Sequence, residues 1–273
     1  MTHPTDATTK AMNSTHATTQ NQQIAGFYDE FSDRLLACYV KGNPRITAAV
    51  EYASGQIPAS AKKLLEVGCG IGETTSRLRQ SRPDVTATGI DISSQNVRTA
   101  QQLFGDQEGL SFFVSDMTSP VEGGPFDVVT LLDVYEHIPA TARESFHQNL
   151  RMSMAPKARL VVTCPSFLHQ NFLKETNPAG LQIVDETIGP MELMRLAEDL
   201  GGHLTDFSYT SIFRTNDYFH ATIDLKIEIA PLPKPTGVRR LLNKLHRKIE
   251  KTPLSGKASR QRRVETKLAR RAA

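Results

Sequence analysis

The sequence has no run of about eighteen apolar residues, so no segment is expected to cross a membrane. Its N-terminus lacks the charged and then apolar pattern of a secretion signal, which argues against export. The three cysteines, at positions 38, 69 and 164, are too scattered for a disulfide framework or a zinc site. No other group of residues has the spacing of metal ligands. These absences predict a cytoplasmic protein that holds no metal.

Charge is distributed very unevenly along the chain. Residues 228–273 contain 14 lysines and arginines against 3 acidic residues, a formal charge of +11. The preceding residues contain 18 basic and 26 acidic residues, a formal charge of −8. The net charge of +3 therefore conceals an acidic body and a basic tail.

Composition divides the chain into three parts. Residues 1–23 are rich in Thr, Gln and Asn and almost without apolar residues, which predicts a disordered polar tail. Residues 24–229 alternate apolar and polar segments and are expected to form one domain. Within it, two helical patterns separated by Asn43-Pro44 predict cap helices over 24–53. Residues 230–273 contain a proline-rich linker and then a basic, partly helical tail.

Strand and helix patterns alternate through the middle of the chain. Strands are predicted over 63–67, 85–90, 110–114, 126–132, 159–164, 204–209 and 218–227, and helices over 74–80, 97–104, 142–152 and 193–200. This order favours an open α/β sheet with right-handed crossovers. The last two strands have no helix between them and should be antiparallel. Residues 165–190 have little periodicity and are predicted to be a long functional loop.

A glycine-rich turn follows the first predicted strand. Gly68, Gly70 and Gly72 occupy alternate positions before a helix, as at the entry of a nucleotide-binding βαβ unit. Glu66 places a negative charge just before this turn, which suits a positively charged ligand better than a pyrophosphate. We infer that the turn binds S-adenosylmethionine. A dinucleotide-dependent dehydrogenase is the alternative, but its third glycine should lie three places after the second, and here the gap is two.

Four motifs in order resemble those of class I S-adenosylmethionine-dependent methyltransferases. They are the segment 66–72, Asp91, Asp116 and the segment 133–139, which reads Asp-Val-Tyr-Glu-His-Ile-Pro. The pattern is similar to that of small-molecule enzymes such as the ubiquinone-biosynthesis O-methyltransferases, and it covers about residues 27–227. The resemblance implies a Rossmann-like, seven-stranded, mostly parallel sheet in the order 3-2-1-4-5-7-6, with helices on both faces.

The resemblance also implies a set of cofactor-binding residues. They are Arg45, Glu66, Gly68, Gly70, Gly72, Asp91, Ile92, Asp116, Met117, Leu132 and Asp133.

Each of these residues has an implied task at the cofactor. The glycines let the backbone wrap the methionine part, and Glu66 faces its ammonium group directly or through water. Asp91 accepts hydrogen bonds from the ribose hydroxyls. Asp116 accepts from the adenine amino group, and Met117 packs nearby.

Leu132 and Asp133 would border the sulfonium and the methionine amine, and Arg45 would hold the cofactor carboxylate. Two of the acidic residues also have simpler explanations. Asp91 could cap the following helix, although Ser93 or Ser94 could do so instead. Asp116 could cap the turn that follows it.

Methyl transfer requires alignment and dehydration of the acceptor, and a base when the acceptor is a hydroxyl or a protonated amine. His137, beside Glu136, is the candidate general base because imidazole titrates near neutrality. A structural role at the edge of the cofactor site is its alternative. Tyr28, Tyr39, His169 and the segment 165–189 are candidates for the acceptor pocket, and each could instead be packing or surface.

The acceptor is expected to be a small or lipid-linked molecule, methylated on oxygen or less readily on nitrogen. The basic tail permits disorder, contact with an anionic membrane through a basic amphipathic helix over 238–249, or nucleic-acid binding. Nucleic acid is the least favoured partner because no reading module accompanies the tail. An RNA or protein methyltransferase, and a cofactor-binding protein without catalysis, are the alternative functions.

Overall fold

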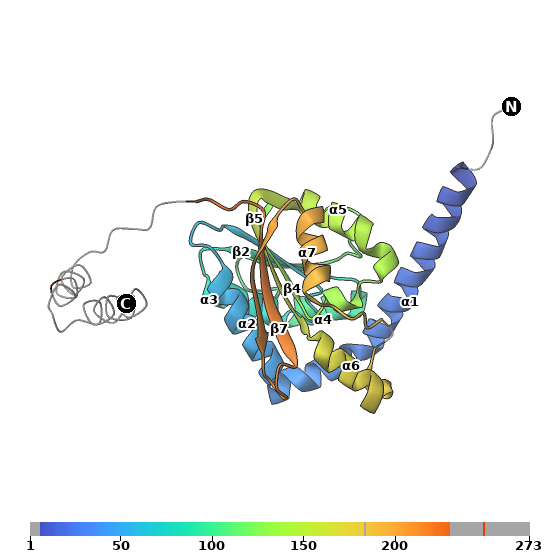
Figure 1. Ribbon diagram of the computed structural model, residues 1–273, viewed down its shortest axis with the longest axis horizontal. Coiled ribbons are helices and arrows are strands. Elements are labelled where there is room, and N and C mark those ends of the chain that lie inside the picture. The colour runs from blue at the N-terminus through green and yellow to red at the C-terminus, as the bar shows by residue number, and fades with distance from the viewer. Residues whose placement is uncertain (1–5, 183, 230–247, 249–273) are drawn as a thin grey trace, which may run out of the picture. The chain divides into compact units, whose positions relative to one another are not determined.

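The computed structural model describes residues 6–182, 184–229 and 248, with side chains from Asn21 onward (Figure 1). Seven strands form one sheet: β1 (Lys63–Val67), β2 (Thr86–Asp91), β3 (Leu110–Val114), β4 (Phe126–Leu132), β5 (Met154–Pro165), β6 (His203–Thr210) and β7 (Tyr218–Asp224). Their order is β3-β2-β1-β4-β5-β7-β6. β7 is antiparallel to both neighbours, and the other pairs are parallel. The predicted sheet order is confirmed.

Helices cover both faces of this sheet. They are α1 (Asp6–Lys41), α2 (Pro44–Gln56), α3 (Glu73–Ser81), α4 (Ser94–Phe104), α5 (Arg143–Ser153), α6 (Phe167–Thr176) and α7 (Pro190–Asp199), with short 3₁₀ helices η1 (Tyr135–His137), η2 (Ala140–Ala142) and η3 (Pro178–Gly180). Successive side chains of a strand point to opposite faces, so each apolar strand supplies two cores. None of the described helices is long and apolar enough to span a membrane.

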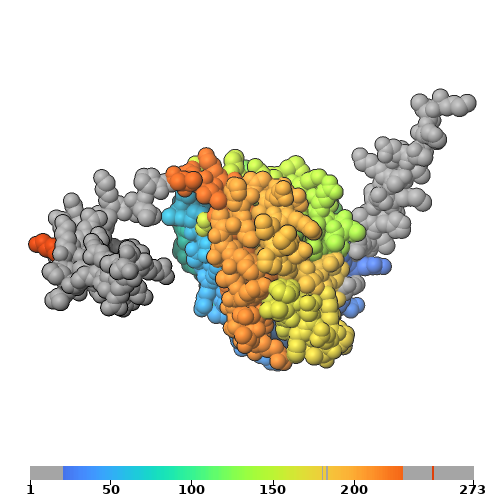
Figure 2. Space-filling view, viewed as in Figure 1, coloured from blue at the N-terminus to red at the C-terminus, as the bar shows by residue number. Residues whose placement is uncertain are grey.

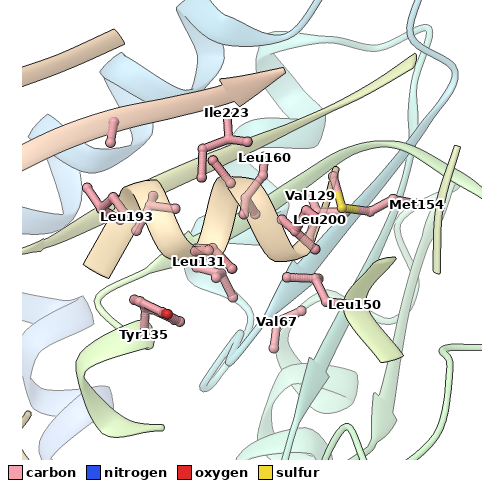
Figure 3. Close-up of a cluster of buried hydrophobic side chains, with 14 of the residues drawn as sticks. Val67, Val129, Leu131, Tyr135, Leu150, Met154, Leu160, Leu193, Leu200 and Ile223 are labelled. Atoms are coloured by element: carbon pink, nitrogen blue, oxygen red, sulfur yellow. The ribbon is translucent and has the colours of Figure 1, made fainter. Parts of the chain in front are cut away.

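The larger core lies between the sheet and the pair α5 and α7. Leu65 and Val67 of β1 and Leu131 of β4 pack there against Leu150 of α5 and Leu193 of α7, as Figure 3 shows for four of these five side chains. On the opposite face, the neighbouring strand residues Leu64 and Val128 pack against α2 and α3. Figure 2 shows the segments from α6 to β7, yellow to orange, forming the centre of one side of the domain. The sheet is therefore fully covered where its middle strands lie.

Two predicted segments differ in the structure. The segment 1–23, expected to be disordered, is helical from Asp6, where it forms the first part of α1. Asn21 at its end already contacts the domain, donating to Asp116. The segment 165–190, expected to be a loop, contains α6, whose first turn is capped by the hydroxyl of Ser166. Its few apolar residues make a half-exposed helix with a weak periodic pattern.

The basic tail falls outside the described residues apart from Lys248. The amphipathic helix expected over 238–249, its membrane contact and the nucleic-acid alternative therefore stay predictions.

The parallel arrangement brings the carboxyl ends of β1 to β4 to one edge of the sheet. In open α/β sheets, ligands bind at this edge, where the connecting loops diverge. Two of the loops contain non-glycine residues in the left-handed region, Met117 after β3 and Asp133 after β4, each with φ of 58°. Such backbone conformations are costly and concentrate at functional sites. The structure thus points to the loops after β1 to β4.

Candidate functional site

A cavity of about 1220 Å³ lies at the carboxyl ends of β1 to β4 and is closed on one side by α1. Its walls include all of the predicted cofactor residues except two. The predicted residues that line it are Arg45, Gly68, Gly70, Asp91, Ile92, Asp116, Met117, Leu132, Asp133 and His137. Residues distant in the sequence therefore meet at one site.

The glycine turn forms the floor of this cavity. Gly68 and Gly70 have φ of 73° and 53°, a region that favours glycine. A Cβ on Gly68 would lie 2.4 Å from Cγ2 of Val134, so the loop after β4 leaves no space for a side chain there. The turn is held close to the next loop by this packing.

The backbone N–H groups of the turn are bonded inside the protein. Those of Gly68 and Cys69 donate to the carbonyl oxygen of Ile90, and that of Gly72 donates to the carbonyl oxygen of Cys69. The N–H of Gly70 donates to Oδ2 of Asp91 at 2.8 Å. A pyrophosphate site needs such groups pointing at the ligand. The turn is therefore built to approach a ligand closely without offering these four donors to a phosphate.

Asp91 joins the glycine turn to the start of α4. Its Oδ1 accepts from the N–H of Ser93 at 2.8 Å, while its Oδ2 accepts from Gly70. Ser93 itself caps α4 by accepting from the N–H of Asn96, so Asp91 is not the cap. Burial raises the pKa of Asp91, and the hydrogen bonds from Ser93 and Gly70 oppose that shift. The carboxylate is held rigidly at the cavity wall.

Glu66 does not reach the cavity. The hydroxyls of Thr74 and Thr75 on α3 donate to its two carboxylate oxygens, and its side chain is buried under that helix. Burial raises its pKa to about 7, against the effect of the two hydroxyl bonds. Gly72 also lies outside the cavity lining, at the N-terminus of α3. In the structure, Glu66 therefore joins β1 to α3 and does not face the ligand directly.

Arg45 and Asp133 form a buried ion pair beside the cavity. Nη1 of Arg45 lies 3.0 Å from Oδ2 of Asp133, whose side chain is 6% exposed. That oxygen accepts no well-directed hydrogen bond. Burial raises the pKa of Asp133, while the charge of Arg45 lowers it; Asp133 in turn raises the pKa of Arg45. Arg45 thus neutralises the charge of Asp133 beside the cavity.

Asp116 follows β3 at the far side of the cavity. Its Oδ1 accepts from the N–H and hydroxyl of Thr118, so it does cap the turn that follows it. Its Oδ2 accepts from the side-chain amide of Asn21 at 3.1 Å. The sequence interpretation missed Asn21 because it lies in the polar segment, which has no apolar periodicity. α1 therefore reaches the loop after β3 as well as the glycine turn.

His137 lies in η1, just after β4, and lines the cavity. Its Nδ1 lies 2.7 Å from the carbonyl oxygen of Val184 and 3.7 Å from Oδ1 of Asp185. Its Nε2 lies 3.8 Å from Oε1 of Glu136. Burial raises the pKa of Glu136 to about 7, an effect that the charge of His137 opposes. A proton-accepting group thus lies between two carboxyl groups at the cavity wall.

Only one of the three aromatic acceptor-pocket candidates lines the cavity. Tyr28 does so, and its hydroxyl donates to Oε1 of Gln182 at 2.9 Å. Tyr39 packs on Phe104 instead, and His169 packs beside Phe172, both away from the cavity lining.

α1 is also tied to the start of α4. Asp29 accepts from the hydroxyl of Ser93 at 2.5 Å and from the N–H of Gln95 at 3.0 Å. A lone Asp in a polar helix carries no sequence signal for this role. The cap expected over the site is therefore present, and its polar contacts come from the tertiary structure.

The cavity wall has a surplus of acidic side chains. Glu73, Asp91, Asp116 and Asp133 line it, against Arg34 and Arg45. A ligand that carries an ammonium and a sulfonium fits such a wall, whereas a pyrophosphate would be repelled. The part of the chain with described side chains contains no group of three His, Cys, Asp or Glu placed to hold a metal ion. The residues present therefore fit S-adenosylmethionine.

Comparisons with known proteins show similarity to methyltransferases. Residues 65–160 match the methyltransferase domain family. A ubiquinone biosynthesis O-methyltransferase of Psychrobacter cryohalolentis is 34% identical over 101 residues, which are 35% of this chain and 38% of that protein. The chain therefore aligns with less than half of that relative. The enzyme of the same name from Methylococcus capsulatus is 26% identical over 206 residues, 69% of this chain and 83% of that protein.

A solved structure has the same fold. Magnesium protoporphyrin IX methyltransferase from Synechocystis PCC 6803, with bound S-adenosylhomocysteine, superimposes with a TM-score of 0.57 at 20% identity. The alignment covers 74% of this chain and 97% of that one.

Proposed function

Because the chain carries a class I S-adenosylmethionine-dependent methyltransferase domain similar to the small-molecule O-methyltransferases, we propose that it methylates an oxygen atom of a small or lipid-linked acceptor. The observation that carries this proposal is the glycine turn, in which the N–H groups of Gly68, Cys69, Gly70 and Gly72 all donate hydrogen bonds within the protein. Together with the acidic wall, this turn favours a sulfonium nucleoside over a dinucleotide.

The size of the cavity supports a second ligand. A pocket for one small ligand usually measures about 300–1000 Å³. The volume here, about 1220 Å³, leaves room for an acceptor beside the cofactor. Phe27, Tyr28 and Phe31 of α1 line it with aromatic surface. An apolar or aromatic acceptor matches this wall.

The cofactor residues divide into three groups in this proposal. Gly68, Gly70 and Asp91 would hold the methionine and ribose parts, and Asp116 and Met117 the adenine part. Asp133 would accept from the ammonium group, with Arg45 balancing its charge. When bound, the cofactor supplies an electrophilic methyl group on sulfur with a good leaving group. The chain itself has to align the acceptor, exclude water and take up a proton.

α1 and His137 supply the last two tasks. α1 covers the cavity and contacts the loops after β2 and β3 through Asp29 and Asn21, so it shields the site from water. A carbonyl oxygen only accepts, so Nδ1 of neutral His137 donates to the Val184 carbonyl. The other ring nitrogen then has a free lone pair. That nitrogen, Nε2, is the proposed acceptor of the hydroxyl proton. Glu136 beside it would stabilise the imidazolium that forms.

Calorimetric titration tests the cofactor assignment. S-adenosylhomocysteine is expected to bind the full chain, and NAD is expected not to bind. Binding of NAD alone would overturn the proposal. The acceptor class is tested by incubating the chain with labelled S-adenosylmethionine and a metabolite extract. Label is expected in apolar extractable products; label only in macromolecules would contradict a small-molecule acceptor.

Replacement of His137 by alanine is expected to lower kcat for a hydroxyl acceptor by about 100-fold or more, because general-base catalysis contributes about that factor. Binding of S-adenosylhomocysteine should change little, since the carboxylates proposed to bind the cofactor remain. The measurement is steady-state turnover beside calorimetry. His169→Ala is the matched control, because His169 does not line the cavity. Unchanged turnover of His137→Ala would sink the assignment of the base.

A further inference from the structure

The segment between α6 and α7 contributes three neighbouring polar contacts around His137. They come from Gln182, Val184 and Asp185, in a region that the sequence predicted only as a loop. We propose that Asp185 is a positioning residue for His137: it holds the carbonyl oxygen of Val184 on Nδ1, so that His137 presents Nε2 as its basic nitrogen. This inference rests on the proposed function, because it assumes that His137 is the base.

The contact of Nδ1 decides the tautomer of His137. Its distance to the carbonyl oxygen of Val184 is 2.7 Å, a hydrogen-bond distance. A carbonyl oxygen has no proton to donate, so Nδ1 must carry the proton in the neutral ring. The hydrogen bond made by one ring nitrogen of a histidine sets which of the two nitrogens carries the proton. Nε2 then keeps its lone pair, as a base requires.

Asp185 holds the backbone that makes this contact. Its Oδ2 accepts from the N–H of Gln182 at 2.8 Å, which closes a turn around Val184. Its Oδ1 accepts from the side-chain amide of Gln170 on α6 at 3.1 Å. Gln170 is buried, with 2% of its surface exposed. The Asp185 carboxylate therefore ties the turn to Gln170 of α6, beside the Val184 carbonyl.

The same turn is attached to the cap helix. The hydroxyl of Tyr28 donates to Oε1 of Gln182, and the Tyr28 ring packs edge-on against His137 with centroids 6.1 Å apart. α1, the turn and His137 therefore meet at one point of the cavity.

The charged groups around His137 come from every element packed against it. Asp185 faces Nδ1 from the turn, Glu136 faces Nε2 from η1, and Asp133 lies at the end of β4. Tyr28 of α1 also packs against the ring of His137. Arg45 balances Asp133, so the carboxylates of Glu136 and Asp185 are left to stabilise a protonated ring. Asp185 thus has an electrostatic effect as well as its effect on geometry.

The test is ¹⁵N NMR of the full chain labelled in histidine, with the His137 signals assigned by comparison with His137→Gln. In the wild-type chain, Nδ1 is expected to be the protonated nitrogen of neutral His137. In Asp185→Ala, which loses both accepted hydrogen bonds, a mixture of the two tautomers is expected. Turnover should fall about 10- to 100-fold through kcat, because misplacing a catalytic group costs this much. Binding of S-adenosylhomocysteine should stay within about twofold.

Two further variants keep the result interpretable. Asp185→Asn retains one acceptor oxygen and should show an intermediate tautomer mixture; it replaces the alanine variant if that one does not fold. Glu186→Gln removes a carboxylate one residue away, whose Oε1 contacts the N–H of Ala140, and should leave the His137 tautomer unchanged. A wild-type ring protonated on Nε2, or an unchanged tautomer in Asp185→Ala, overturns the inference. A third outcome separates the two proposals. If Asp185→Ala shows the tautomer mixture but the wild-type chain transfers no methyl group, the positioning role is supported and the proposed function is refuted.

Discussion

Replacing Asp91 with alanine is expected to weaken binding of S-adenosylhomocysteine by about 100-fold or more, which is roughly 2.7 kcal/mol. Two effects combine. The cofactor would lose the carboxylate proposed to bind its ribose hydroxyls. In addition, the N–H groups of Gly70 and Ser93 would lose their acceptor, so the glycine turn and the start of α4 would no longer be joined. Calorimetric titration of the variant measures the loss.

Two controls separate these effects. Asp91→Asn keeps one oxygen for Gly70 or Ser93 and should lose less affinity than the alanine variant. Asp84→Asn removes a carboxylate just before the start of the same strand, where Asp84 contacts Lys62 and Arg82 far from the cavity lining. It should bind S-adenosylhomocysteine as the wild-type chain does. If Asp91→Ala bound within about threefold of wild type, the cofactor orientation proposed for this cavity would be wrong.

Replacing Arg45 with methionine is expected to lower the free energy of unfolding by about 2–4 kcal/mol near neutral pH. The variant leaves Asp133 buried without its partner, next to the buried carboxyl of Glu136. Removing one member of a buried ion pair costs more than the pair contributes, because the remaining charge is uncompensated. The value lies near the lower end of the usual range because the Arg45 side chain is 28% exposed. Chemical denaturation measures it.

The destabilisation caused by Arg45→Met should increase with pH. Burial raises the pKa of Asp133 in the folded chain, and without Arg45 it should rise further. A carboxyl group with a raised pKa stabilises the folded state while it is protonated and loses that contribution as the pH rises through the folded pKa. The destabilisation by Arg45→Met should therefore be smallest at acid pH and grow toward neutrality.

An ion pair away from the cavity provides the comparison for Arg45. Arg159 pairs with Asp224 through two nitrogens, and neither residue lines the cavity. Arg159→Met should also destabilise the chain but leave binding of S-adenosylhomocysteine unchanged. Arg45→Met should lower both the stability of the chain and its affinity for S-adenosylhomocysteine. Equal loss of binding in the two variants would mean that Arg45 acts only through general stability.

The strands themselves followed from local sequence because each strand carries its own apolar run between turns, whereas their order was implied by the resemblance to the methyltransferases. β1, β3 and β4 have the predicted limits, and β7 lies antiparallel between β5 and β6. The fifth and sixth predicted strands were short at both ends, where hydrogen bonding continues beyond the apolar run. The second predicted strand lay one residue too early, and the seventh ran three residues too far. Helix α6 was missed because its apolar residues are few and half exposed, and α1 was expected to begin later for the same reason.

The direction of individual side chains was less predictable. Glu66 occupies its motif position, but its carboxylate turns under α3 to the hydroxyls of Thr74 and Thr75. A carboxylate at the end of a strand has no sequence signal that distinguishes a ligand from a helix hydroxyl as its partner. The contact of Arg45 with Asp133 likewise depends on how α2 packs on the end of β4.

By itself, the sequence determined the sheet, the glycine turn and the class of ligand, since these depend on apolar periodicity, glycine conformations and charges close together in the chain. Only the tertiary structure decided which side chains reach the cavity and what each one contacts. Asn21 and Asp185 come from segments without a recognisable pattern, and Asp29 comes from a predicted cap helix whose pattern does not single it out. They matter because folding brings them within hydrogen-bond distance of Asp116, the turn beside His137 and Ser93. Hydrogen bonds of this kind act over about 3 Å, and no spacing along the chain encodes such a distance between remote segments.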